Sequence, residues 1–144
     1  MIHKAMPKDA LTIAGLAIQM WPDNTIEELA KEFEKLTISE GSAIFICLIE
    51  NQVIGFAQCQ LRHDYVEGTE SSPVGYLEGI YVCEEYRKEG YAKELLAKCE
   101  EWAKEKGCSE FASDCELTND VSFRFHLNVG FTEENRIICF TKKI

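Results

Sequence analysis

The sequence predicts a mixed α/β fold, in which one central sheet carries helices on both faces. Residues 43–49 and 53–62 read as two strands separated by a tight turn, which predicts an antiparallel hairpin. Residues 76–82 read as a buried strand, and 91–106 as an amphipathic helix that follows it. A further strand at 110–115 comes after this helix. The strands at either end of the helix should therefore be parallel and joined by a right-handed crossover.

The first forty residues should form a short strand and two helices. Ile2–Ala5 is the expected strand, and a helix with Asp9 as its N-cap should run to about Met20. Trp21 stands before a proline and should stop this helix, because that position avoids helical geometry. Thr25-Ile-Glu-Glu28 has the capping-box pattern of a second helix start. The apolar face of this second helix is formed by Ile26, Leu29, Ala30, Phe33 and Leu36.

The second half of the chain alternates loops, helices and strands. Residues 63–73 form a polar loop that is long enough to be functional. Gly107 should close the long helix. Asn119 or Asp120 should cap a short helix at 121–128, and Asn135–Lys143 should be the last strand. With 144 residues, we expect one domain over residues 1–144.

The charge balance limits the classes of partner. The chain has 25 acidic and 15 basic residues, which gives a net charge of −10. Nucleic acid is therefore not expected as a partner, because phosphate backbones require basic surfaces. A cationic substrate is permitted. We find neither a signal peptide nor an apolar run of the roughly 20 residues that a membrane span needs, so we expect a cytoplasmic protein without membrane contact.

The cysteines indicate neither disulfides nor a metal site. There are seven, no two have Cys-x-x-Cys spacing, and most lie in apolar strand or helix contexts. We interpret them as reduced, small hydrophobic residues of a cytoplasmic protein, and we expect no metal.

The turn between the strand at 76–82 and the long helix has the pattern Arg87-x-x-Gly90-x-Ala92. Small residues at a helix start let a ligand approach backbone N–H groups that have no partner inside the helix. The turn could therefore bind a phosphate or pyrophosphate. It matches neither the Walker pattern nor Gly-x-Gly-x-x-Gly. The alternative is an ordinary turn with a chance glycine.

Two motifs resemble the GNAT acetyltransferase superfamily. The turn resembles its Arg/Gln-x-x-Gly-x-Gly/Ala loop, which grips the pyrophosphate of acetyl-CoA. Asn119, Phe125-His126 and Gly130-Phe131 resemble its last motif, and one helix and one strand separate the two motifs. The resemblance implies a GNAT-like fold, with a largely antiparallel sheet and two splayed parallel strands. It also implies acetyl-CoA as cosubstrate.

A more specific resemblance is to the aminoglycoside 6′-N-acetyltransferases. It rests on Trp21-Pro22, Arg62-His63-Asp64-Tyr65-Val66, Ser71-Ser72-Pro73, Leu77-Glu78-Gly79-Ile80 and Ala112-Ser113-Asp114. It implies acetylation of an antibiotic's 6′-amine, and a homodimer. By this resemblance the antibiotic site is lined by Trp21, Tyr65, Glu78 and Asp114. The residues implied to hold acetyl-CoA are Ile80, Tyr81, Val82, Arg87, Lys88, Glu89, Gly90, Tyr91, Ala92 and Asn119.

The expected catalytic residues are Glu78, Asp114 and His126. Glu78 lies in a strand that otherwise reads as buried, where a carboxylate is costly unless it is paired or functional. It could bind the amine and relay its proton, and Gly79 beside it suggests a β-bulge. Asp114 ends the neighbouring parallel strand, near which ligands of open α/β sheets bind. His126 stands where the superfamily often has a proton-donating tyrosine.

Each of these residues also has a structural interpretation. Glu78 could form a salt bridge at the rim, and Asp114 could precede a helix as a cap. Trp21 could be a core or interface aromatic residue, and Tyr65 could pack within its loop. His126 could be a packed helix histidine. We assign the neighbouring His63 and Asp64 to loop structure, because no nucleophile elbow accompanies them.

Three functions are compatible with the sequence. The first is an aminoglycoside 6′-N-acetyltransferase. The second is a GNAT enzyme that acetylates another amine, such as a polyamine or a peptide N-terminus. The third is a non-catalytic acetyl-CoA-binding module. The segments around Trp21-Pro22 and His63-Asp64-Tyr65 favour the first.

Overall fold

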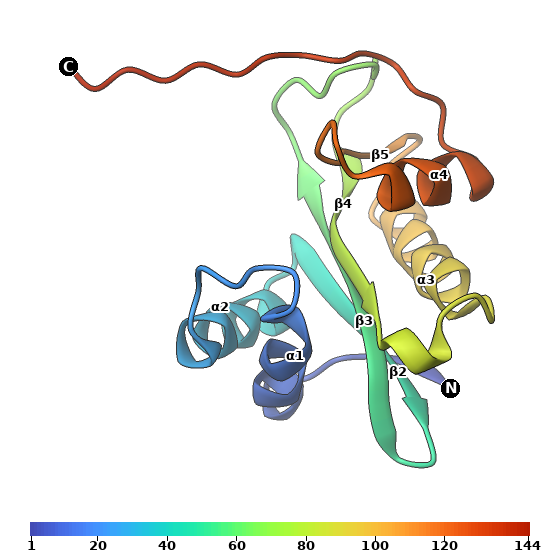
Figure 1. Cartoon of the computed structure of the whole chain (residues 1–144). Coiled ribbons are helices and arrows are strands. Elements are labelled where there is room, and N and C mark those ends of the chain that lie inside the picture. Colours follow the sequence, from blue (N-terminus) through green and yellow to red (C-terminus); the bar gives the residue numbers. More distant parts are fainter.

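A five-stranded sheet runs through the centre of the computed structural model, which describes residues 1–144 (Figure 1). The strands occur in the order β1 (Ile2–Lys4), β2 (Ser42–Ile49), β3 (Gln52–Arg62), β4 (Val74–Val82) and β5 (Phe111–Ser113). Neighbours from β1 to β4 are antiparallel, whereas β4 and β5 are parallel. The predicted mixed sheet is therefore confirmed.

Helices cover both faces of the sheet, as predicted (Figure 1). The helices are α1 (Ala10–Ala17), α2 (Ile26–Ile38), α3 (Tyr91–Glu105) and α4 (Asp120–Asn128). On one face α1 and α2 pack over β-strand residues such as Ile44 and Phe56. On the other face α3 buries Leu95 and Cys99 against Phe45 and its neighbours. None of the helices combines the length and apolar character needed to cross a bilayer.

The local signals for the hairpin and for α2 are confirmed. Glu50 and Asn51 both have positive φ, at 49° and 66°, which is the backbone of a two-residue type I′ turn. The Thr25 hydroxyl accepts a hydrogen bond from the Glu28 N–H at 3.1 Å, so Thr25 is the N-cap of α2.

The first helix begins directly after Asp9, the predicted N-cap position, but its capping contact and its end differ from the prediction. The Asp9 carboxylate accepts from the preceding Met6 N–H at 2.8 Å instead of capping the helix after it. The helix α1 ends at Ala17, three residues before Met20. The reason is that the chain tightens there into three-residue turns, in which the Met20 N–H bonds to the Ala17 carbonyl.

The predicted strand Asn135–Lys143 is wrong for this single chain. Residues 131–144 contain no helix or strand, and Figure 1 shows this segment leaving α4 and extending away from the body. Ile137, Ile138 and Phe140 are 68%, 81% and 87% exposed. A strand needs a neighbour to pair its N–H and C=O groups, and this segment has none within its own chain.

Two irregularities shape β4 around residue 78. Gln58 pairs with Gly79 and Cys59 with Leu77, so Glu78 is an extra residue with no partner across the ladder. This is the β-bulge that Gly79 suggested. The pairing of β4 with β5 covers only Gly75, Tyr76 and Leu77. The two parallel strands therefore separate where the bulge begins.

Candidate active site

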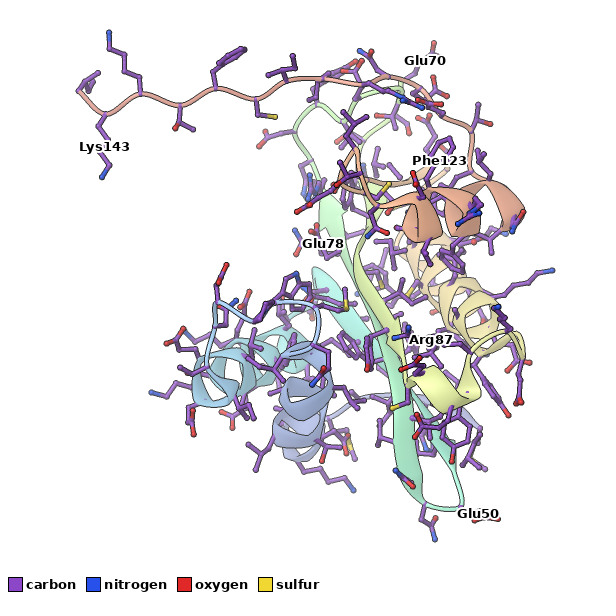
Figure 2. The ribbon with its side chains drawn as sticks, viewed as in Figure 1. Glu50, Glu70, Glu78, Arg87, Phe123 and Lys143 are labelled. Atoms are coloured by element: carbon purple, nitrogen blue, oxygen red, sulfur yellow. The ribbon has the colours of Figure 1, made fainter.

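Glu78 lies on β4 at the bulge, on the side of the sheet where α1 and α2 pack (Figure 2). Its carboxylate is paired with Arg62 at the end of β3. Arg62 Nη2 donates to both carboxylate oxygens, at 2.8 and 3.1 Å, and Nε donates to one of them at 3.1 Å. The side chains of Arg62 and Glu78 are 38% and 21% exposed. Glu78 is thus held in a specific orientation by a charge-assisted, forked contact.

Tyr76 connects this ion pair to Asp114. The guanidinium carbon of Arg62 lies 3.5 Å from the centre of the Tyr76 ring, a close cation–π contact. The Tyr76 hydroxyl donates to a carboxylate oxygen of Asp114. Burial of the ring, together with this hydrogen bond, raises the pKa of Tyr76. The hydroxyl therefore stays protonated at neutral pH and acts as a fixed donor. Glu78 and Asp114 therefore belong to one polar cluster, connected through Arg62 and Tyr76.

Trp21 lies against the same part of β4. A Cβ atom on Gly79 would stand only 2.8 Å from Cη2 of Trp21, so the indole rests directly on the glycine. The Trp21 ring also contacts Phe33 of α2, with ring centres 6.4 Å apart. Trp21 is half-buried, and it combines core packing with a position next to Glu78.

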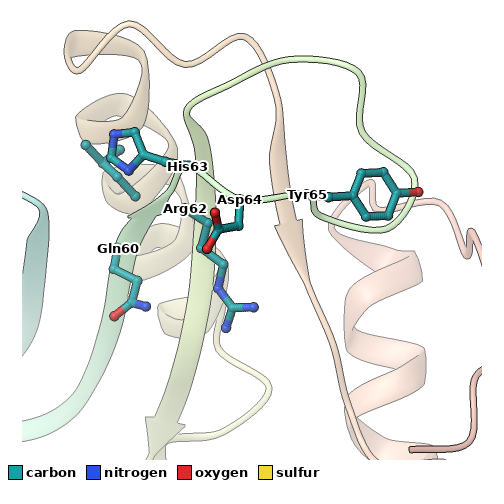
Figure 3. A pocket seen from close by; sticks show the side chains of 6 residues that line it. Gln60, Arg62, His63, Asp64 and Tyr65 are labelled. Carbon is teal, nitrogen blue, oxygen red and sulfur yellow. The ribbon is translucent and has the colours of Figure 1, made fainter.

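The loop between β3 and β4 carries Tyr65, which is 78% exposed. Figure 3 shows its ring pointing away from Arg62 and Asp64. A hollow of about 450 Å³ opens beside this segment and is lined by residues 60–65. Packing within the loop does not hold Tyr65 in this conformation.

Glu110, just before β5, fastens that loop to the body. Its carboxylate accepts hydrogen bonds from the Ser71 hydroxyl at 2.5 Å and from the N–H groups of Glu70 and Ser71 at 2.9 Å. The Ser71 hydroxyl and then the Glu70 N–H lower the pKa of Glu110. The loop is therefore tied at its far end, while the segment with Tyr65 stays open.

Beyond Leu77, where the pairing of β4 with β5 ends, the exposed edge of β4 has backbone N–H groups without partners. The Cys83 N–H bonds to the Ile54 carbonyl of the β3 strand. By alternation, the N–H groups of Ile80 and Val82 point the other way, toward the side of β5. The Val82 carbonyl confirms this direction, because it accepts from Arg87 Nε at 2.7 Å. The pairing with β5 ends at Leu77, so an extended ligand could pair with this edge as an added strand.

The turn after β4 leads into the N-terminus of α3. Gly90 is the N-cap, with φ of 92° and ψ of 0°, a left-handed conformation that favours glycine. A Cβ at Gly90 would meet nothing within 4 Å, so the space above this backbone is open. Three N–H groups at the start of α3, those of Tyr91, Ala92 and Lys93, precede the first intrahelical hydrogen bond, which joins Glu94 to Gly90. Arg87 itself lies beside the end of β4 (Figure 2).

Asn119 and His126 both belong to α4. Asn119 caps the helix, because its side chain accepts from the Ser122 N–H at 3.1 Å. The His126 ring packs against Phe125 and Phe131. Its Nδ1 lies 2.7 Å from the Ser122 carbonyl, which can only accept, so Nδ1 carries a proton. In the neutral ring, Nε2 then accepts from the Ser113 hydroxyl at 2.8 Å.

Four members of this arrangement had no expected role in the site from the sequence alone. Arg62, Tyr76 and Ser113 contact the candidate residues directly, and Glu110 fastens the loop. Tyr76 stands two residues before Glu78, so the alternation of a strand could have placed both on one face. Arg62 could not be found in this way, because its partner is set by the register of β3 against β4. No group of histidine, cysteine or acidic residues in the structure has the geometry of a metal site.

Comparison with known proteins points to one family. Residues 11–131 match the model of the acetyltransferase (GNAT) family. The chain is 40% identical over 141 residues to the aminoglycoside N(6′)-acetyltransferase type 1 of Stenotrophomonas maltophilia, covering 96% of this chain and 90% of the relative. It is 40% identical over 129 residues to the corresponding protein of Salmonella typhimurium, covering 90% and 89%.

Solved structures give the same result. AAC(6′)-Iy in complex with a bisubstrate analogue, CoA-S-monomethyl-acetylneamine, superposes with a TM-score of 0.95 at 36% identity, over 100% of this chain and 98% of the other. The 6′-N-acetyltransferase AAC(6′)-Ih of Acinetobacter baumannii superposes with a TM-score of 0.94 at 34% identity, over 100% and 98%.

The lowered pKa of Glu110 leads to a prediction about pH. The carboxylate stabilises the fold above its unfolded pKa, and this contribution disappears as pH falls through the folded pKa. Glu110→Gln should therefore lower the melting temperature most at neutral pH, and the difference from the parent should shrink as pH drops below 4.5. Thermal unfolding between pH 7 and pH 3 measures this. Glu105→Gln, on the exposed end of α3, is the control. An equal difference for Glu110→Gln at every pH would contradict the role of the charge.

Proposed function

Because the chain belongs to the acetyltransferase (GNAT) family, we propose that it transfers the acetyl group of acetyl-CoA to the 6′-amine of an aminoglycoside antibiotic, which confers resistance. The observation that carries the proposal is the position of Glu78. It lies one residue beyond the last paired position of β4 and β5, next to the backbone edge that is free to bind an extended cosubstrate. An amine at Glu78 would be adjacent to an acyl group held along that edge.

The residues present fit acetyl-CoA. The free edge at Ile80 to Val82, with Tyr81 between them, suits the pantetheine arm. The segment Arg87, Lys88, Glu89, Gly90, Tyr91 and Ala92 offers unpaired helix N–H groups to the pyrophosphate. Asn119, the cap of α4, is the further residue proposed to hold acetyl-CoA. When bound, acetyl-CoA supplies an activated acetyl thioester.

The catalytic roles follow from the charges. The N–H groups of Ile80 or Val82 can stabilise negative charge that develops on a carbonyl oxygen. Glu78 holds the substrate ammonium and accepts its proton, directly or through water. Asp114 supplies a second fixed negative charge for a polycationic substrate. His126 is the acid candidate; it would act in its imidazolium form, in which Nε2 carries a proton and donates to the Ser113 hydroxyl oxygen.

The substrate site is formed by Trp21, Tyr65, Glu78 and Asp114. Trp21 offers a flat apolar surface on which a sugar ring can stack. Tyr65 is exposed on an open loop, so its hydroxyl is free to bind a polar group. The similarity to aminoglycoside N(6′)-acetyltransferases supports an aminoglycoside over a polyamine or peptide. The cytoplasm is the proposed location, supported by seven unpaired thiols.

A thiol-release assay with acetyl-CoA tests this function. Kanamycin and tobramycin should be acetylated at the 6′-amine, and much faster than spermidine or a peptide. Preference for spermidine or the peptide would favour another GNAT substrate. Tight acetyl-CoA binding without release for any amine would favour the non-catalytic module.

The carboxylates should differ in kinetic effect. Asp114→Asn removes a fixed negative partner and should raise the KM for kanamycin by about 10- to 100-fold, at about 1.4 kcal/mol per factor of ten. Glu78→Gln should lower kcat and flatten the acidic limb of its pH profile, because the proton acceptor is lost. In both variants, the KM for acetyl-CoA serves as the control. A Glu78→Gln enzyme with the parent's kcat and pH profile would exclude the base role.

Gly90 allows a test of the pyrophosphate loop. Gly90→Ala forces a side chain into a left-handed backbone beside the binding amides, and should weaken acetyl-CoA binding at least about tenfold. Gly107→Ala is a matched control, because Gly107 also has φ of 92° and open space around it, but lies at the other end of α3. Calorimetry should show normal affinity for Gly107→Ala despite a similar loss of stability. Equal affinities in both variants would make the loop assignment wrong.

The homodimer is proposed to form through the C-terminal segment. Its apolar residues Ile137, Ile138 and Phe140 are exposed, and the outer edge of β5 is unpaired in the sheet order. Pairing this segment with β5 of a second copy would cover the apolar residues and would also give the free edge of β5 a partner strand, since apolar edge strands are normally covered. The segment is already fixed at its start, where Asn135 donates to Glu67 at 2.9 Å.

Light scattering should therefore show a dimer, and Phe140→Asp should shift it toward monomer by placing a charge in the interface. Leu11→Asp is the control, because Leu11 is also an exposed apolar residue but lies on α1. A parent protein that is monomeric at working concentration would contradict the dimer.

A further inference from the structure

Arg62 occupies a site built for a cation. Its guanidinium lies between the Glu78 carboxylate, with contacts of 2.8 to 3.1 Å, and the face of Tyr76, 3.5 Å from the ring centre. Tyr76 is only 6% exposed, and its hydroxyl is fixed by Asp114. A carboxylate beside an aromatic face is the arrangement that binds ammonium and guanidinium groups.

This occupancy conflicts with the proposed role of Glu78. The reaction needs a substrate ammonium at this carboxylate, yet both of its oxygens already accept from Arg62. A second cation in the same place would be repelled by the guanidinium. Either the guanidinium leaves when substrate arrives, or Glu78 never contacts the amine.

The surroundings of Arg62 leave space into which its guanidinium can move away from Glu78. Arg62 is the last residue of β3, and the exposed loop begins at the next residue. Its side chain is 38% exposed and borders the hollow of about 450 Å³. Figure 3 shows the carboxylate of Asp64 on the same side of the chain as Arg62, so the departing guanidinium would have another negative group nearby.

We propose that Arg62 is an intramolecular placeholder, which neutralises Glu78 in the free enzyme and is displaced by the cationic amine of the substrate. The inference rests on the proposed function. It makes Arg62 a positioning and specificity-determining residue. A substrate must compete with the guanidinium, so polycations that also engage Asp114 are favoured over amines with a single charge.

The alternative is a permanent clamp that only orients Glu78. The two roles predict opposite effects of removing Arg62. Without a placeholder, the substrate no longer has to break an ion pair, so affinity rises. Without a clamp, Glu78 loses its orientation, so affinity or turnover falls.

The first experiment needs no substrate. Guanidinium chloride at low millimolar concentration should raise the melting temperature of Arg62→Ala by filling the vacated site. It should not do so for the parent, or for the double variant Arg62→Ala with Glu78→Gln. A response of Arg62→Ala no larger than that of the double variant would overturn the inference.

The second experiment measures tobramycin binding by calorimetry in the presence of CoA. Arg62→Ala should bind tobramycin about two- to fivefold more tightly than the parent, which corresponds to the energy of an exposed or partly exposed ion pair. Arg62→Lys keeps the positive charge but cannot form the forked guanidinium contact. Its affinity for tobramycin should lie between those of the parent and Arg62→Ala. Unchanged or weaker binding in Arg62→Ala would overturn the placeholder role. Lys98→Ala, which removes an exposed ion pair with Glu101 on α3, is the control and should bind like the parent.

The two experiments separate the two proposals. If the parent acetylates no aminoglycoside while Arg62→Ala still binds guanidinium through Glu78, only the proposed function fails. If the parent acetylates kanamycin but Arg62→Ala neither binds guanidinium nor gains affinity, only the placeholder fails.

Discussion

The separation of β4 from β5 after Leu77 is the constraint on which the rest of the site depends. Up to that residue the two strands share a parallel ladder, and beyond it the backbone of β4 has no neighbour on that side. Backbone groups in a sheet must find partners, so an unpaired stretch inside a fold needs water or a ligand. The bulge at Glu78 falls at the point of separation, and the acidic side chain there is paired with Arg62 at the end of β3.

Tight packing fixes where the strands can still meet. A Cβ on Gly75 would lie 2.6 Å from the Phe111 ring and 2.7 Å from Ala103, so glycine lets β4, β5 and α3 approach closely at the paired end. Farther along β4, the partly buried Ile80 packs against the core on the α3 side, and so does Phe125 of α4. The sheet is thus closed at one end and open at the other.

Electrostatics in the site reflect the general cost of burying charge. An acidic chain that places a half-buried carboxylate in a strand must provide a cation or a donor for it. Here Glu78 is paired with Arg62 and Asp114 with Tyr76, and these two pairs contact each other through the Tyr76 ring. A cationic substrate therefore meets carboxylates that already have partners within the protein, and binding depends on exchange of partners as well as on attraction.

Local signals in the sequence determined much of this protein. The Thr25 cap, the hairpin turn, the α3 stripe and the Gly-containing turn before α3 are interactions between residues close in the chain, so sequence alone could predict them. The bulge at Glu78 was also predictable, because the adjacent glycine is a local signal. Only the tertiary structure decided the partners of Glu78 and Asp114, because strand register brings Arg62 and Tyr76 to them from other positions. It also decided the state of residues 135–143. Their apolar pattern is that of a strand, but a strand forms only when it pairs with a neighbouring edge, and in the single chain these residues pair with none.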